Sequence, residues 1–392
     1  MEKQEFDLLL KGGRIIDPNQ GLDQTHDIVF SRGKVTAIGS SFDSNRAKQV
    51  IDVSGFLVVP GLIDLHTHVY WGGTALSVKA DPLSMRSGVT TFVDTGSAGA
   101  GNFHGFKTFI INQSRARILS FLHIAYPGIP CLGRELGKEF IVPLTDPLLF
   151  NVVAAKRVAL ENSDEIVGIK VRAGVGSDGP SLQPVYMARD VAERIGKPMM
   201  VHLGGPPPQI ETILPLMRSG DIVTHSFRPY PNSILNEKGQ PILEVLEAVA
   251  RGVILDVGHG AGGCSFNIAR AALSSGLAPD VISTDVHVNS INGPVFDLPT
   301  TLSKFLALGM SLSEVIAAST INPAKAIGWD DRIGHLKPGA FGDATVLELK
   351  DEVITLSDSV GEMLNAEKVL RHIATIIDGK YYPHSHDGSL NH

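Results

Sequence analysis

The sequence has few cysteines, no long apolar run and no block of basic residues, and each shortage excludes a class of protein. Only two of the 392 residues are cysteine, Cys131 and Cys264, which are too few for a disulfide framework and are typical of a reducing compartment. No run approaches the roughly 18 uninterrupted apolar residues of a membrane-spanning helix. The formal net charge is −7, so charge gives no case for binding nucleic acid.

The first residues of the sequence do not predict a secretory signal peptide. These residues, "MEKQEFDLLLKGG", include acidic side chains and no apolar core of a secretory signal. We therefore predict a cytoplasmic protein with no membrane or nucleic-acid partner. Hydrophobic residues make up 43% of the chain and charged residues 19%, which is enough for a large core. The length suits one large domain plus a smaller one.

The two ends of the chain share one texture, which differs from that of the middle. Residues 1–60 mix apolar runs with Gly, Pro and Asp turn signals, and the same mixture returns over residues 336–392, with turns at Pro338-Gly339 and Gly342-Asp343. We predict that the two ends together form one small β domain, beside a central domain of residues 61–335.

The central region alternates short apolar runs with helical segments. Near-continuous apolar strands that alternate with helices are typical of a parallel sheet covered by helices. Eight such units predict an α/β fold, a (β/α)8 TIM barrel. The runs span residues 62–68, 89–96, 116–125, 165–174, 197–205, 220–227, 252–260 and 280–288. Two poorly patterned stretches, 95–116 and 127–150, are predicted to be long loops over the barrel mouth.

Side chains that suit a metal recur where these runs end. They are His66 and His68 in the first run, Lys170 in the fourth, His202 in the fifth, His225 in the sixth and Asp285 in the eighth. The carboxyl ends of barrel strands meet at one end of the barrel, so these side chains are expected to lie together. Imidazole nitrogens and a carboxylate oxygen suit zinc, and manganese, iron or cobalt as well.

Lys170 is the informative member of this set. An ordinary ammonium repels a cation, but burial lowers the pKa of a lysine, and the neutral amine can add carbon dioxide to give an anionic carbamate. Such a group could bridge two metals about 3.5–4 Å apart. The alternative is a lysine that pairs with an acid or points to solvent. The nearby histidines and Asp285 favour the bridging interpretation.

These motifs resemble the amidohydrolase superfamily. The likeness rests on "VPGLIDLHTH", "GIKVR", "VHLGG", "THSF", "STDVH" and the closing "LKPGAFGDATV", and it covers nearly the whole chain. It implies a binuclear metal centre in a (β/α)8 barrel beside a small β-sandwich that is built from both chain ends. By resemblance, His66, His68 and Asp285 would hold the buried metal, His202 and His225 the outer metal, and carboxylated Lys170 would bridge them. A homo-oligomer is compatible with the resemblance, although the sequence has no visible interface signature.

Within the superfamily, "DVGHGAGGCSFNIARAA" and "STDVHVNSINGP" resemble a bacterial deacetylase-like group that is often labelled dihydroorotase. Two departures argue against other groups. Dihydroorotases usually carry an arginine after their H-x-H motif, whereas this chain has "HTHVYWGG". Mononuclear deaminases often place a glutamate three residues after the fifth-strand histidine, where this chain has Gly205.

The predicted chemistry is hydrolysis. Two divalent ions that share a water lower its pKa and make a hydroxide nucleophile. Asp285 is the candidate catalytic base, because one carboxylate oxygen can bind metal while the other faces the water. We predict a hydrolase that removes an acyl group, preferentially acetyl, from an amide or ester of a small carboxylated substrate. The alternatives are a cyclic amidohydrolase that opens a ring and a catalytically silent scaffold homologue.

Five further residues are candidates for contacting the substrate. Arg172 and His287 lie two positions after Lys170 and Asp285, so they are expected to point the same way, nearer the mouth. An arginine there could hold a carboxylate by paired hydrogen bonds. Arg228 and Tyr126 directly follow the sixth and third runs, and His259 lies at the end of the seventh. The alternative for the charged members is a loop salt bridge, and the glycines of "GHGAGG" around His259 lack the spacing of a phosphate loop.

Overall fold

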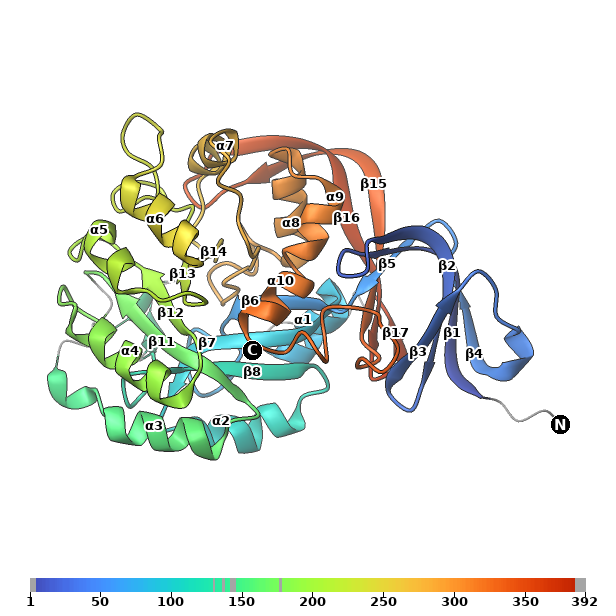
Figure 1. Cartoon of the computed structure of the whole chain (residues 1–392), viewed down its shortest axis with the longest axis horizontal. Helices are drawn as coiled ribbons and strands as arrows, with labels where there is room; N and C mark the ends of the chain where they lie inside the picture. Colours follow the sequence, from blue (N-terminus) through green and yellow to red (C-terminus); the bar gives the residue numbers. More distant parts are fainter. Residues whose placement is uncertain (1–4, 130, 136–137, 142–145, 176–177, 385–392) are drawn as a thin grey trace.

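The protein is described by a computed structural model, which covers residues 5–384 apart from 130, 136–137, 142–145 and 176–177. Figure 1 shows two joined regions. The middle of the chain forms a sheet flanked by helices, and the first and last strands form a β-rich region at the other side of the molecule. The C-terminal tail after residue 384 lies outside the described residues.

Seven parallel strands of the middle region follow one another in the sheet in chain order. They are β6 (Leu62–Thr67), β7 (Val89–Gly99), β8 (Arg117–His123), β11 (Ile166–Ala173), β12 (Met199–Leu203), β13 (Ile222–Thr224) and β14 (Ile254–Asp256). The eighth predicted run is a bridging segment rather than a regular strand. Parallel bridges join Val281 to Asp256 of β14 and Val286 to Thr67 of β6. The segment therefore lies between the first and last strands, and the predicted barrel-like α/β fold is confirmed.

The strands are buried on both faces, which explains their continuous apolar runs. Every residue of β6, β7 and β11 is buried. A strand that is covered on both sides needs apolar side chains at successive positions rather than at alternate ones. The polar residues at the ends of these strands therefore stand out against an apolar background.

Helices cover the outer side of this sheet (Figure 1). The longest helix among the described residues, α4, packs against β11 and β12 through the buried face that includes Val185, Ala188 and Ala192. No helix in the described part of the chain is long and apolar enough to cross a membrane. The helices are α1 (Ala80–Ser87), α2 (Phe103–Phe109), α3 (Val152–Glu161), α4 (Gln183–Ile195), α5 (Ile210–Ile213), α6 (Leu243–Arg251), α7 (Phe266–Ser274), α8 (Leu298–Ala307), α9 (Leu312–Ala317) and α10 (Ile321–Ala326).

The two chain ends meet in one mixed sheet. Its strands are β1 (Phe6–Asp17), β2 (Leu22–Ser31), β3 (Lys34–Gly39), β4 (Ala47–Asp52), β5 (Leu57–Pro60), β15 (Ala344–Ser357), β16 (Met363–Ile377) and β17 (Lys380–Pro383). The junction is β5, which pairs antiparallel with β15 and parallel with β1. Both ends thus contribute to one β region, while its sandwich arrangement and the boundaries at residues 60 and 335 stay predictions.

The hairpin of β15 and β16 extends beyond this region and reaches the barrel (Figure 1). β16 packs against α8, and the hairpin tip contacts the segment before α7. There Asp358 accepts a hydrogen bond from the backbone N–H of Phe266 at 2.8 Å, and Ser359 donates its N–H to the carbonyl of Cys264 at 3.1 Å. The C-terminal strands therefore support a loop at the mouth of the barrel.

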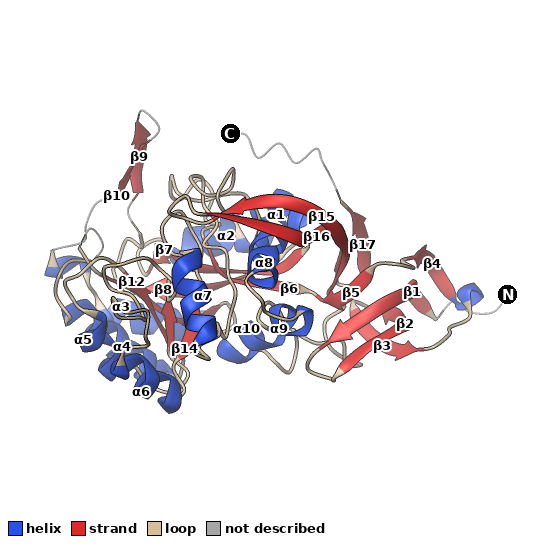
Figure 2. Cartoon of the chain, turned by 90° about the horizontal axis from the view of Figure 1, so that it is seen from above, coloured by secondary structure: helices blue, strands red, loops and turns tan. Residues whose placement is uncertain are grey.

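Both segments predicted to be loops contain regular structure, so that prediction was wrong in part. Segment 95–116 includes the end of β7 and the helix α2, whose Phe103 and Phe106 are buried. Segment 127–150 includes an antiparallel pair, β9 (Cys131–Glu135) and β10 (Lys138–Ile141), which projects from the barrel in Figure 2. Glycines at turns hide the short elements between them from a search for periodicity.

Candidate metal centre

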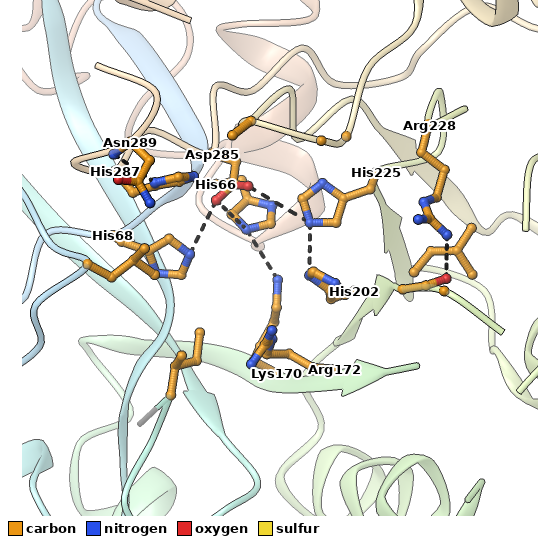
Figure 3. Close-up of a pocket in the computed structure, with 18 of the residues that line it drawn as sticks. His66, His68, Lys170, Arg172, His202, His225, Arg228, Asp285, His287 and Asn289 are labelled. Carbon is orange, nitrogen blue, oxygen red and sulfur yellow. Dashed lines mark hydrogen bonds and ion pairs between the residues drawn. The ribbon is translucent and has the colours of Figure 1, made fainter. Parts of the chain in front are cut away.

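The six predicted ligand residues line one cavity of about 370 Å³ at the carboxyl ends of the barrel strands. They come from five places in the fold. His66 lies in β6 and His68 just after it, Lys170 lies in β11, His202 in β12, His225 just after β13 and Asp285 in the bridging segment. Figure 3 shows their side chains converging on Asp285. Residues more than 200 positions apart in the chain thus meet at one end of the barrel, as the strand order requires.

The first group in this cavity consists of His66, His68 and Asp285. Oδ1 of Asp285 lies 3.4 Å from Nε2 of His66 and 3.2 Å from Nε2 of His68. One donor atom from each of the three residues lies within 4.8 Å of the other two, and all three residues have low exposure. Two imidazoles and a carboxylate at this spacing could hold a divalent metal ion.

The second group lies on the other side of Asp285. Nε2 of His225 is 2.9 Å from Nδ1 of His202 and 4.0 Å from Oδ2 of Asp285. Asp285 therefore lies between the two histidine pairs, with a different carboxylate oxygen towards each. One carboxylate oxygen can therefore bind a cation beside His66 and His68, while the other stays available on the side of His225.

Hydrogen bonds from the protein orient the rings of three histidines. Nδ1 of His66 lies 2.7 Å from the hydroxyl of Thr224, and Nδ1 of His68 lies 2.9 Å from the hydroxyl of Ser97. Nδ1 of His225 donates to the carbonyl of Gly258 at 2.6 Å. In each ring Nδ1 is engaged with the protein, so Nε2 is the nitrogen that faces Asp285. Metal-binding histidines usually show this division between their two nitrogens.

Three buried groups behind His66, namely Thr224, Asp256 and Ser283, were missed from the sequence. The hydroxyl of Thr224 donates to Oδ2 of Asp256 at 2.6 Å, and the hydroxyl of Ser283 donates to Oδ1 of Asp256 at 2.6 Å. Asp256 is fully buried and ends β14. A carboxylate at a strand end was a visible signal, but its link to His66 depends on the pairing of Thr224 with Asp256 between β13 and β14.

Burial keeps the histidines neutral, which a metal ligand requires. Burial is the largest cause of the lowered pKa of all four. It lowers the pKa of His68 and of His225 to about 4, and it lowers those of His66 and His202 well below the usual range. In each neutral ring, the nitrogen that carries no proton is therefore a lone-pair donor near neutral pH.

Lys170 has the environment that its predicted role needs. Its side chain is buried, and Nζ lies 3.4 Å from Nε2 of His66. Burial lowers the pKa of Lys170 to about 7, although Asp285 and Asp256 act in the opposite direction. An amine with this pKa is partly neutral at pH 7, and only a neutral amine can add carbon dioxide. The donor set and this lysine together fit a site for divalent cations.

The backbone is strained at two of the six residues. His225 has φ of +65° and Asp285 has φ of +48°, in the left-handed region that residues other than glycine seldom adopt. Residues held in such conformations cost on the order of 1–3 kcal/mol each and cluster at functional sites. The strain aims both side chains into the cavity from the points where their strands end.

Three of the five residues proposed to contact the substrate line the same cavity, namely Arg172, Arg228 and His287. Arg172 is only 7% exposed, and its Nη1 has no hydrogen-bond partner among the described residues. Nη1 of Arg228 donates to the carbonyls of Gly204 and Pro231. Arg172 is thus the arginine whose Nη1 is still able to donate a hydrogen bond to a ligand. Asn289, which was not predicted, also lines the cavity.

His259 and Tyr126 are not part of the cavity lining that the structure describes. His259 is fully buried, with Nε2 2.9 Å from Nζ of Lys304, so its ring points away from the cavity into the protein. Tyr126 is 46% exposed and lies beside Gly101 outside the cavity. Sequence position placed both residues after barrel strands, but it could not give the direction of their side chains.

Comparisons with known proteins agree with this geometry. The model of the amidohydrolase family matches residues 57–381. A deacetylase of Agrobacterium fabrum is 37% identical over 368 residues, which cover 92% of this chain and 88% of the relative. A dihydroorotase structure matches with a TM-score of 0.86 and 35% identity over 96% of this chain and 98% of that one. An adenine deaminase structure matches with a TM-score of 0.88 and 30% identity over 97% of this chain and all of that one.

Proposed function

The chain belongs to the amidohydrolase family, and on that premise we propose a binuclear metal-dependent hydrolase that removes an acyl group, preferentially acetyl, from an amide or ester of a small carboxylated substrate. The family and the curated relatives indicate a hydrolase that acts on C–N bonds. The observation that carries the finer proposal is the place of Arg172. Its buried, unpartnered Nη1 lines the same cavity as the six donor residues. A buried N–H of a cation without a hydrogen-bond partner is costly, and a substrate carboxylate would accept from it.

The same residues divide into two proposed metal sites. His66, His68 and Asp285 would hold one divalent ion, His202 and His225 would hold the other, and Lys170 as a carbamate would bridge them. Zinc suits these ligands best, and manganese, iron or cobalt are alternatives. When bound, such ions supply water activation and carbonyl polarisation.

The protein groups supply proton transfer and orientation. Asp285 is the proposed base. Its Oδ2, on the side of His225, would take the proton of the attacking water and pass it to the leaving amine or alkoxide. Arg172 would hold the substrate carboxylate through Nη1 and so fix the acyl carbonyl near Asp285. Arg228 and His287 would complete the wall around the leaving group.

The test is acetate release by the metal-loaded protein from a panel of N-acetyl amino acids and O-acetyl hydroxy acids. Each compound is paired with its neutral amide or methyl ester. We expect acetate from at least one carboxylated member and much slower release from its neutral partner. Equal rates of acetate release from a carboxylated compound and its neutral partner would contradict the role of Arg172. If none of the compounds releases acetate, deacylation is contradicted.

A second candidate function is ring opening by a cyclic amidohydrolase. It is favoured by the dihydroorotase structure, which is 35% identical to this chain. Cyclic ureides and imides assayed beside the acetyl compounds distinguish the two, since ring opening loses no small fragment. Ring opening without acetate release would make Arg172 a clamp for a ring carboxylate. The chain has a suitable donor residue at all six positions, which argues against a catalytically silent scaffold homologue.

A further inference from the structure

Lys304 in α8 is a fully buried lysine outside the cavity lining. Its helix is held firmly. Asp297 caps α8 through the N–H of Thr300, and the hydroxyl of Ser303 accepts a hydrogen bond from the N–H of Leu370 in β16 at 2.9 Å. Lys304 therefore extends its ammonium from a fixed position.

The ammonium of Lys304 connects two separate loops. Nζ lies 2.9 Å from Nε2 of His259, and it donates to the carbonyl of Pro294 at 2.7 Å. Nδ1 of His259 lies 3.0 Å from the carbonyl of Gly260, which only accepts, so the proton is on Nδ1 and Nε2 is the acceptor. His259 belongs to loop 258–263, and Pro294 belongs to loop 287–297, which follows the bridging segment.

Both loops form walls of the cavity. Ala261, Gly262 and Gly263 line it from the first loop, and His287 and Asn289 line it from the second. The first loop also touches the candidate ligands. Gly258 accepts the hydrogen bond of His225, and a Cβ on Gly260 would lie 2.3 Å from Oδ2 of Asp285. Only glycine fits there, and a loop so rich in glycine needs contacts from elsewhere to hold its shape.

An ammonium is a costly way to fill a buried space. Burial lowers the pKa of Lys304 to about 8, which means that the fold holds its proton less firmly than water does. An apolar side chain of similar length would avoid this penalty. Unlike an apolar side chain, however, lysine can donate two directed hydrogen bonds, and here it donates one to each of the two loops that line the cavity.

We propose that Lys304 is a positioning residue that ties loop 258–263 to loop 287–297 and thereby sets the shape of the substrate cavity. Lys304 touches neither the cavity nor the candidate ligands, so it acts through His259 and Pro294. Its role in substrate selection rests on the proposed hydrolase function. Its role in joining the loops does not, and it can be tested without a substrate.

The first experiment is amide hydrogen exchange of the metal-loaded Lys304→Met protein. We expect about tenfold faster exchange in both loops, because removing the shared ammonium frees each from the other. The matched control is Lys197→Met. Lys197 is a partly buried lysine that also donates to two backbone carbonyls, of Ser163 and Ile166, but it lies before β12, at the opposite end of the barrel. Unchanged exchange in both loops of Lys304→Met would overturn the proposal.

A second pair of variants keeps the test open if Lys304→Met does not fold. His259→Gln places an amide near the position of Nε2, whereas His259→Leu removes the acceptor. We expect His259→Leu to loosen both loops and His259→Gln to restore their slow exchange. Loosening that is the same in both variants would mean that His259 only fills space, which would also overturn the proposal.

Kinetics then separates this proposal from the proposed function. With a substrate found in the acetate panel, we expect Lys304→Met to raise KM about tenfold for bulky members, with a smaller effect on small members and unchanged metal content. If the loops loosen but KM changes by the same factor for bulky and small members, the specificity role is overturned. If no acetate is released by the parent protein, the proposed function fails while the exchange result stands.

Discussion

The hydroxyl of Thr224 donates to Asp256 at 2.6 Å while its oxygen lies 2.7 Å from Nδ1 of His66. A hydroxyl has one proton, so donation to Asp256 leaves the Thr224 oxygen as the acceptor for Nδ1–H of His66. The buried carboxylate thereby determines which nitrogen of His66 carries the proton. Nε2 is left as a lone-pair donor towards Asp285.

This relationship predicts that Thr224→Val weakens metal binding. Valine has nearly the shape of threonine but cannot accept from His66, so the ring loses its fixed tautomer. We expect a 10- to 100-fold loss of metal affinity, the usual effect of removing such a partner. Metal titration with a competing chelator measures it. The control is Thr345→Val, whose buried hydroxyl donates to the carbonyl of Gly88 far from the cavity. Equal metal affinity in Thr224→Val and Thr345→Val would rule out this role of Thr224.

Replacing Lys170 tests the bridging role. We expect Lys170→Ala to lower kcat by at least about 10³-fold and to reduce the bound metal, because the carbamate would be the shared ligand of both ions. Carbon-13 NMR of the parent protein in labelled bicarbonate is expected to show a carbamate signal that Lys170→Ala lacks. A thermal unfolding scan checks that the variant still folds. Full activity in Lys170→Ala would disprove the bridged centre.

Arg172→Met tests the carboxylate clamp. A hydrogen bond to a charged group contributes about 1.5–3 kcal/mol, so we expect KM for carboxylated substrates to rise about 10- to 150-fold. Neutral esters of the same substrates are expected to be affected little. Arg228→Met is the comparison, because both carbonyls that accept from Nη1 of Arg228 belong to the protein itself. If the two variants behave alike, Arg172 has no special role.

Sequence reasoning succeeded where the signal was local and periodic. Continuous apolar runs identify strands buried on both faces, and strand order then brings their last residues together. His66 and Asp285 could be paired in this way although 218 other residues separate them. The family resemblance and the barrel-like fold were both confirmed. The bridging segment around Asp285 makes only isolated bridges, yet it occupies the predicted place.

The failures share a different cause. His259 follows a strand, as the ligands do, but its direction depends on the partner that Lys304 offers from a helix 45 positions later. The link of Thr224 and Asp256 to His66 could not be seen from the sequence, since their hydrogen bond arises only when β13 and β14 pair in one register. Long-range contacts of single polar atoms leave no periodic trace in a sequence.

Lys304 also predicts how stability depends on pH. Burial lowers its pKa from 10.5 to about 8 in the folded protein, and Cys264, Asp358 and Asp297 counteract this only in part. His259 beside it is neutral, since its pKa is lowered to about 3. The unfolded chain therefore binds this proton more tightly than the folded one. The resulting destabilisation is complete below pH 8, and it is lost progressively as the pH rises towards 10.5.

We therefore expect Lys304→Met to unfold at a higher temperature than the parent at pH 7 and to lose that advantage near pH 10. Between pH 8 and 10.5 the difference in unfolding free energy should shrink by roughly 1.4 kcal/mol per pH unit. Denaturant unfolding at a series of pH values measures it, with Lys197→Met as the partly buried comparison. A variant that is more stable but less selective would show that Lys304 is retained for the cavity and not for the fold. A variant that is less stable at every pH would show that Lys304 is retained for the stability of the fold.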